Sequence, residues 1–266
     1  MMPGIFARTF YRSTLEENLD AIVNYGLHHV QFNMSCAGLP TLPDSIGPAL
    51  IERIRRETVA RGITINALSG TYNMIHPDLN VRKAGLLHLR MLVAACKGMG
   101  TSIITLCTGT RDATDMWRWH PDNSSESAWT DLCSVMEQAL QIAEDENVIL
   151  AFEPEQANVV YSAPRARLLL DTLRSPRLKV VIDPANLFSP DSVQKLPNIL
   201  DEAFALLGTD IVVAHAKDRR PDGTVTPAGT GVLDYDQYLR LLHSLRAQGR
   251  RRCRLAALPR GLDHRS

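Results

Sequence analysis

Apolar segments of strand length alternate with longer segments of helical spacing along most of the chain. Apolar residues three or four positions apart, such as Leu15, Leu19 and Ile22, predict a helix. The strands predicted in this way are Ile5–Ala7, His29–Phe32, Ile63–Leu68, Ser102–Leu106, Val148–Phe152, Leu178–Ile182 and Ile211–Ala214. The helices predicted between and after them are Leu15–Tyr25, Pro48–Arg61, Val81–Met99, Ser127–Glu146, Pro164–Leu173, Pro197–Leu207 and Asp234–Leu245. The pattern therefore predicts seven consecutive β/α units.

Seven such units favour a closed β/α barrel over a doubly wound sheet. The repeats are short, no Gly-x-Gly-x-x-Gly follows the first strand, and polar residues occupy the strand ends. The chain of 266 residues matches the roughly 250 residues of a single barrel. No linker or low-complexity stretch divides the chain. We therefore predict an α/β protein with one TIM (β/α)8 barrel domain spanning residues 1–266.

The eighth unit departs from this pattern. Residues 246–254 include five arginines, the short apolar run Leu255–Leu258 follows, and Pro259–Ser266 leaves no room for a covering helix. We expect strand eight and the final helix to be atypical or incomplete and residues 246–266 to form an atypical tail. An incomplete closing strand leaves the edges of strands one and seven exposed. The sequence therefore predicts marginal stability or homo-oligomerisation.

Composition and charge narrow the functional classes. The chain has 29 basic and 29 acidic residues, so nothing in its overall charge demands a nucleic-acid or membrane partner. No run approaches the roughly 18 apolar residues of a membrane helix, and Met1–Arg12 lacks the apolar block of a signal peptide. The five cysteines are scattered without a Cys-x-x-Cys pair, as is typical of reduced thiols. We expect a cytoplasmic protein with no nucleic-acid and no membrane partner.

Three polar motifs each follow an apolar strand: Glu153-Pro154-Glu155, Asp183-Pro184-Ala185-Asn186 and His215-Ala216-Lys217-Asp218. Their leading residues are 30 and 32 positions apart, about the length of one β/α unit. One repeat between them places all three at the same end of a parallel barrel, where active sites of such barrels lie. Carboxylate and imidazole groups suit a divalent metal. The alternative is structural: the carboxylates cap helices, and the histidine is a hydrogen-bonded core residue.

Further candidates lie in the loops over this end of the barrel. Glu155, Asn186 and Lys217 follow the leading residues and are candidate substrate contacts, whereas loop solvation or a Lys217–Asp218 ion pair is the alternative. His76, in a polar loop after the third strand, is a candidate substrate ligand or a solvated loop residue.

Two tryptophans lie in a longer insertion after the fourth strand. Trp117 and Trp119 are compatible with a wall for a sugar ring or with a small satellite core, and we favour the core.

Together with Gly229-Thr230-Gly231-Val232-Leu233-Asp234-Tyr235, these motifs resemble the sugar phosphate isomerase/epimerase family of the xylose isomerase-like TIM barrel superfamily. The resemblance runs from about Ala7 to Leu245. It implies a divalent Mn, Mg, Co or Zn ion held by Glu153, Asp183 and His215, with Glu153 as the catalytic base. It also implies a small-molecule sugar, ketose or polyol substrate that reacts through an enediolate-like intermediate.

The chain departs from this family at two positions. The family's fourth ligand is a glutamate after strand eight, and no glutamate follows Glu202 here. Asn186 stands where many members have a histidine. The resemblance therefore implies a metal-dependent isomerase or epimerase impaired by loss of the strand-eight Glu, and the alternative is a noncatalytic sugar-binding or vestigial barrel. A DNA-repair role like that of endonuclease IV is disfavoured by the neutral charge and the placement of the histidines.

Overall fold

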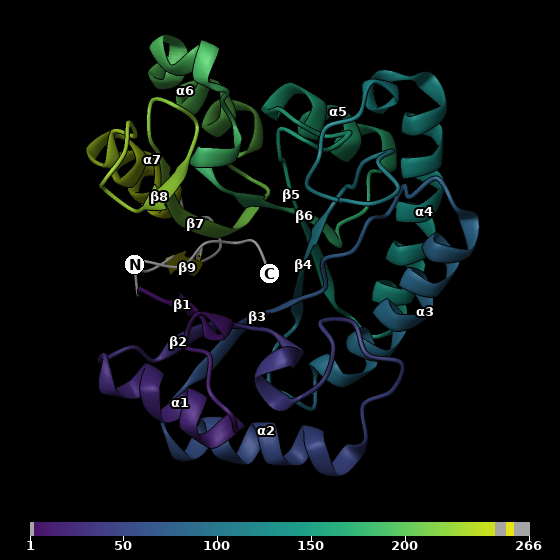
Figure 1. Cartoon of the computed structure of the whole chain (residues 1–266), viewed down its shortest axis with the longest axis vertical. Helices are drawn as coiled ribbons and strands as arrows, with labels where there is room; N and C mark the ends of the chain where they lie inside the picture. The colour runs from purple at the N-terminus through teal and green to yellow at the C-terminus, as the bar shows by residue number, and fades with distance from the viewer. Residues whose placement is uncertain (1–2, 248–253, 258–266) are drawn as a thin grey trace.

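The computed structural model describes residues 3–247 and 254–257. A ring of parallel strands occupies its centre, and helices surround the ring (Figure 1). The strands of the ring are β1 (Ile5–Phe6), β2 (His29–Phe32), β3 (Thr64–Ser69), β4 (Ile103–Cys107), β5 (Ile149–Glu153), β6 (Leu178–Ile182), β7 (Ile211–Arg219) and β9 (Arg254–Ala257). Consecutive strands from β1 to β7 pair in parallel, and β9 joins β7 to β1. The predicted TIM barrel is confirmed.

Seven α-helices of the described chain cover the outside of this ring. They are α1 (Leu15–Asn24), α2 (Pro48–Ala60), α3 (Leu79–Cys96), α4 (Glu126–Asp145), α5 (Ala163–Leu173), α6 (Leu196–Leu207) and α7 (Tyr235–Ala247). Local sequence explains where they begin: Thr14 and Glu17 form a capping box on α1, and Ser125 caps α4. Their bounds differ from the predicted ones by a few residues. No described helix combines the length and apolarity needed to cross a bilayer.

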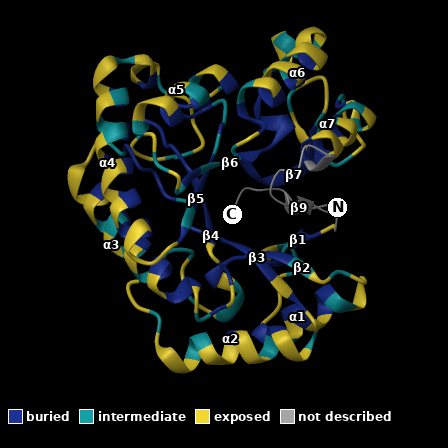
Figure 2. Cartoon of the chain, turned by 180° about the vertical axis from the view of Figure 1, so that it is seen from behind, coloured by how far each residue is buried: buried dark blue, intermediate teal, exposed yellow. Residues whose placement is uncertain are grey.

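Apolar side chains separate into two buried layers. Most of them form one large cluster between the strands and the inward faces of the helices (Figure 2). A smaller cluster brings together residues of β3 to β7 that mostly alternate with members of the first, and it includes two adjacent residues of β7 where the register with β6 shifts: Ala67, Ile103, Ala151, Val181, Val212 and Val213. Because neighbouring residues of a strand point to opposite faces, this second cluster fills the interior of the barrel. The barrel is therefore a packed core that supports the residues at its ends.

The seventh strand is longer than its sequence pattern predicts. We expected it to end at Ala214, but β7 continues to Arg219 and pairs antiparallel with a short strand, β8 (Val225–Pro227), that we did not predict. We did not predict a strand from His215 to Asp218, because three of these four residues are polar. In the structure the side chains of His215, Lys217 and Asp218 are buried and hydrogen-bonded, and their burial in a strand is therefore compensated. The extension makes His215 and Lys217 part of a regular strand.

The eighth strand of the ring, β9, is the atypical element that the sequence predicts. It spans only Arg254–Ala257, one residue earlier than expected. Four of its residues are in register with β7, but only Ala257 pairs with β1, at Ile5. Our expectation that the edges of β1 and β7 are both exposed is therefore wrong where β9 pairs with them, at residues 213–216 of β7 and at Ile5 of β1. The predicted absence of a final helix concerns residues 258–266, which lie outside the described chain.

Candidate metal site

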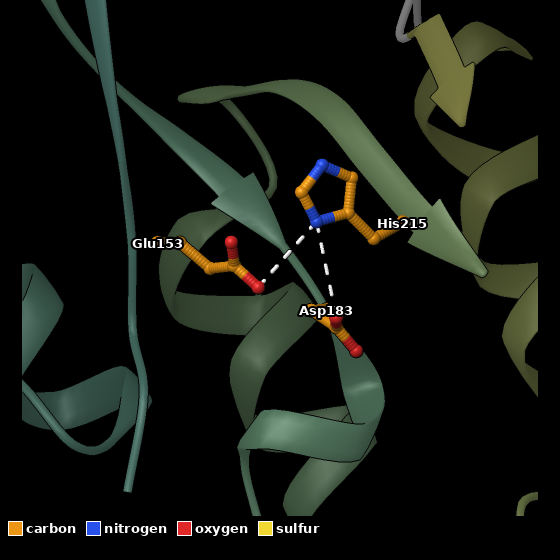
Figure 3. A group of neighbouring side chains, drawn as sticks. All are labelled: Glu153, Asp183 and His215. Atoms are coloured by element: carbon orange, nitrogen blue, oxygen red, sulfur yellow. Dashed lines mark ion pairs between the residues drawn. The ribbon is translucent and has the colours of Figure 1, made fainter. Parts of the chain in front are cut away.

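Three side chains lie together towards the carboxyl end of the barrel: Glu153 ends β5, Asp183 directly follows β6, and His215 lies in the middle of β7 (Figure 3). Each offers one ligand atom, and these atoms all lie within 4.8 Å of one another. Asp183 and His215 are buried, and Glu153 retains a partly exposed side chain. We call these residues the metal triad. Two carboxylate oxygens and one imidazole nitrogen are a donor set that Zn²⁺, Mn²⁺ or Mg²⁺ accepts.

The charges of the triad are only partly balanced. His215 Nδ1 lies 3.4 Å from Glu153 Oε1 and 3.8 Å from Asp183 Oδ2, and Lys217 Nζ lies 3.1 Å from the same Asp183 oxygen. Burial raises the pKa of Asp183, and the negative charge of Glu153 adds to this effect. Burial also acts to raise the pKa of Glu153, but the charges of His215 and Lys217 prevail and lower it to about 2. A bound cation would relieve the remaining excess of negative charge.

Two of the predicted substrate residues lie directly beside the triad. Asn186 Nδ2 donates to Glu153 Oε1 at 2.7 Å, and Lys217 Nζ donates to Asn186 Oδ1 at 2.6 Å. Both side chains are buried. Asn186 therefore holds the carboxylate of Glu153 in place and is itself held by Lys217.

The Lys217–Asp218 ion pair considered as an alternative is not the arrangement found. Lys217 pairs with Asp183 instead. Asp218 accepts hydrogen bonds from the backbone amides of Gly231 at 2.8 Å and Leu233 at 3.1 Å. A Cβ on Gly231 would lie only 2.3 Å from Asp218 Oδ1, so the glycine allows this close approach. Asp218 thus anchors the Gly229–Leu233 turn on β7.

Gln31 completes the site, and the sequence analysis missed it. Gln31 Oε1 lies 3.0 Å from His215 Nε2, and Gln31 Nε2 donates to Ser69 Oγ at 3.1 Å and to Thr105 Oγ1 at 3.0 Å. Thr105 gives its own hydroxyl hydrogen to the Leu68 carbonyl, so it accepts from the Gln31 amide. Gln31 Oε1 is then the acceptor for His215, and Nε2 of that histidine is the donor. This leaves Nδ1, the nitrogen available to a metal, facing Glu153 and Asp183.

The other two predicted substrate residues lie in loops. His76 connects the loop after β3 to the loop after β4, since its Nε2 lies 3.0 Å from the Ala113 carbonyl oxygen. Its Nδ1 accepts a hydrogen bond from the Asp78 amide. These contacts do not join His76 to the metal triad, and its contact with substrate stays a prediction. Glu155 Oε2 accepts from Ala157 N at 2.8 Å, and burial raises the pKa of Glu155.

A cleft of about 540 Å³ opens beside Glu155. Its walls are Trp117, Trp119, Ser124, Glu155, Gln156, Ala157, Tyr161 and Arg219. Both tryptophan side chains are 55% exposed, so the satellite core that we favoured for them is wrong. The indoles instead line an open surface near the candidate site.

Comparisons with known proteins agree with this architecture. A family model described as xylose isomerase-like TIM barrel matches residues 19–254. No curated protein matched the chain in a sequence comparison.

Solved structures share the fold at low sequence identity. The IOLI protein with a binding zinc atom is 16% identical with a TM-score of 0.69, over 98% of this chain and 90% of that chain. A D-psicose 3-epimerase with D-tagatose from Clostridium cellulolyticum H10 is 15% identical with a TM-score of 0.70, over 99% and 87% of the two chains. A xylose isomerase-like TIM barrel protein from Mycobacterium smegmatis in complex with magnesium is 15% identical with a TM-score of 0.66, over 91% and 80%.

Proposed function

The chain belongs to the xylose isomerase-like TIM barrel family, and from this membership and the metal triad we propose that it is a metal-dependent sugar isomerase or epimerase. Its substrate is a sugar, ketose or polyol that reacts through an enediolate-like intermediate. The observation that carries the proposal is the convergence of Glu153, Asp183 and His215 within 4.8 Å at the carboxyl end of the barrel. Similar structures include a zinc-bound protein and a ketose epimerase, which supports both the metal and the substrate class.

The residues around the triad suit the removal of a proton next to a carbonyl group. A divalent ion in this site supplies Lewis-acid stabilisation of the negative charge that develops on the substrate oxygens. Glu153 is the proposed base, because its pKa is lowered and its carboxylate is therefore ionised at neutral pH. Asn186, hydrogen-bonded to Oε1, fixes the orientation of that carboxylate. Lys217, whose Nζ contacts Asp183 and Asn186, is the proposed hydrogen-bond donor to a substrate oxygen.

Among the described residues, the metal triad has no fourth ligand from β9, and this limits the chemistry that we propose. The eighth strand reads Arg-Leu-Ala-Ala, and no glutamate follows Glu202. Epimerisation through a planar intermediate needs a second acid or base on the opposite face, whereas enolisation needs only one. The proposal therefore favours one-sided proton removal over efficient epimerisation. A noncatalytic sugar-binding barrel is the second candidate, and the same missing residue supports it.

Hydrogen–deuterium exchange at the carbon next to the ketose carbonyl separates these two functions. In D₂O with Mn²⁺, the protein should exchange this proton in at least one member of a ketose panel, measured by NMR. Exchange should disappear with a chelator and fall at least 100-fold in Glu153→Gln, the loss usual when a general base is removed. Binding of Mn²⁺ and ketose without exchange would establish the noncatalytic barrel instead.

A further inference from the structure

The cleft beside the metal triad has aromatic walls that remain uncovered. Trp117 and Trp119 are each 55% exposed and Tyr161 is 41% exposed, and all three line the same cleft of about 540 Å³. Ligand sites usually combine such aromatic walls with a few polar groups. Here the charged groups are Glu155 and Arg219, and Ser124 and Gln156 add neutral polar groups. The composition of the cleft is that of a binding site for a ring with polar edges.

The loop that carries the two tryptophans is held by its own hydrogen bonds. Thr110 Oγ1 donates to the Arg118 carbonyl at 2.8 Å, and the Trp117 amide donates to Asp115 Oδ1 at 2.9 Å. Arg118 Nη1 also donates to Asp112 Oδ2 at 3.2 Å. The backbone therefore presents the indoles outward from an organised loop. Trp117 and Trp119 are therefore exposed although their loop is well ordered by internal hydrogen bonds.

The cleft is connected to the metal triad through two side chains. Arg219 lines the cleft, and its Nη2 donates to Asn186 Oδ1 at 3.4 Å. Asn186 in turn donates to Glu153 Oε1 at 2.7 Å. None of the triad residues lines the cleft itself. A ligand that reaches both places must therefore have one part at the triad and another part between the aromatic walls.

The charges in the cleft indicate that the second part is neutral. One carboxylate, Glu155, faces one guanidinium, Arg219. Arg219 already donates to the carbonyl oxygens of Ala185 at 2.6 Å and Gly223 at 3.0 Å, so those donors are used within the protein. A phosphate would lie next to the carboxylate of Glu155 and would find few free N–H donors on Arg219. A sugar ring can instead pack its C–H face on the indoles and donate its hydroxyls to Glu155.

We propose that this cleft is a subsite for a second sugar ring, so that the preferred substrate is a ketose glycoside, such as a ketose disaccharide, rather than a free or phosphorylated ketose. The inference rests on the proposed function, because the first ring must occupy the metal triad. Trp117 and Trp119 form the walls of the subsite, and Glu155 supplies the hydrogen-bond acceptor for ring hydroxyls.

The test compares two-ring and one-ring ketoses on the Mn²⁺-loaded protein. Lactulose and maltulose carry a second ring in different linkages, and D-fructose and D-fructose 6-phosphate do not. Tryptophan fluorescence and calorimetry should give a Kd at least tenfold lower for one of the disaccharides than for either one-ring sugar. In Trp117→Ala/Trp119→Ala, the ratio of the two Kd values should fall close to one. The double phenylalanine variant should keep part of the preference, because a benzene ring still provides an aromatic wall.

Tyr25→Ala is the matched control, because Tyr25 is 74% exposed and does not line the cleft. This variant should retain the full preference, and Mn²⁺ affinity should stay within twofold in all variants. Equal or tighter binding of the one-ring sugars by the unmodified protein would overturn the second-ring subsite. Proton exchange on the whole ketose panel, the disaccharides included, decides the proposed function separately: exchange without a disaccharide preference retains the enzyme and removes the subsite. A tryptophan-dependent disaccharide preference without exchange retains the subsite and removes the enzyme.

Discussion

The two ends of β6 and β7 carry opposite balances of charge. At the amino ends, Asp210 precedes β7 and accepts hydrogen bonds from Lys179 Nζ at 2.6 Å and Arg167 Nη1 at 3.0 Å. Burial acts to raise the pKa of Asp210, but these two cations prevail and lower it. At the carboxyl ends, two carboxylates share one histidine and one lysine, and the pKa of Asp183 is raised.

The difference separates a stabilising cluster from a candidate functional one. Asp210 lies within hydrogen-bonding distance of two cations, one of which, Arg167, also pairs with Asp171 at 2.7 Å. The amino-end cluster therefore pairs charges of both signs and gains stability from being assembled. At the carboxyl end, two carboxylates converge on one histidine, and burial raises the pKa of Asp183. Such perturbed arrangements are typical of sites that bind a further charged group. The barrel thus has stabilising ion pairs at one end and a candidate metal site at the other.

The largest expected effect is on metal affinity at the carboxyl end. His215→Ala and Glu153→Gln should each raise the Kd for Mn²⁺ at least 100-fold, about 2.7 kcal/mol, because the triad provides only three protein ligands. Titration calorimetry measures this directly. Glu155→Gln and Asp210→Asn should leave the Kd nearly unchanged. An unchanged Kd in both triad variants would remove the metal site.

The free energy of unfolding should depend more on the amino-end cluster than on the metal triad. Asp210→Asn should lower the free energy of unfolding by about 2 kcal/mol, because it breaks hydrogen bonds between charged, half-buried groups. Asp183→Asn should change the stability of the metal-free protein less, since burial already disfavours its ionised form. Urea unfolding of the two variants compares the ends of the barrel. If Asp183→Asn loses more free energy of unfolding than Asp210→Asn, then the carboxyl end, and not the amino end, stabilises the barrel.

Gln31→Leu tests the positioning of His215 without removing a ligand. Loss of the acceptor for Nε2 should raise the Kd for Mn²⁺ about 10-fold, the lower end of the usual cost of losing a partner of a metal-bound histidine. NMR of the histidine ring should show a mixed tautomer in the metal-free variant. The same ring spectrum in Gln31→Leu as in the unmodified protein would show that Gln31 does not set the tautomer.

The smallest expected effect is on the pH dependence of stability. Because the folded protein lowers the pKa of Asp210, the stabilisation is complete above the unfolded pKa of about 3.9 and is lost as the pH falls through the lower folded value. The stability difference between the unmodified protein and Asp210→Asn should therefore shrink below about pH 4. The raised pKa of Asp183 acts in the other direction, and the metal-free protein loses stability as the pH rises through it. Unfolding curves at several pH values measure both slopes.

Strand order and the three motif positions could be predicted because hydrophobic periodicity and repeat length are local properties of a sequence. The continuation of β7 could not be predicted in this way, since Lys217 and Asp218 become compatible with a strand only through partners elsewhere. Gln31 was missed for the same reason: an amide in an apolar strand is visible in the sequence, but its contact with His215 is not. The exposure of Trp117 depends on a loop network that periodicity does not reveal.

The hydrogen bond between Gln31 and His215 joins residues 184 positions apart. Glu153, Asp183 and His215 all come from the second half of the chain, whereas Gln31 lies on β2. Contacts between distant segments form late when closing the intervening chain is slow. The orientation of the imidazole is then among the last features to form during folding. A metal ion added to a refolding chain should bind in two kinetic phases, and the tighter phase should coincide with docking of the β1–β2 segment.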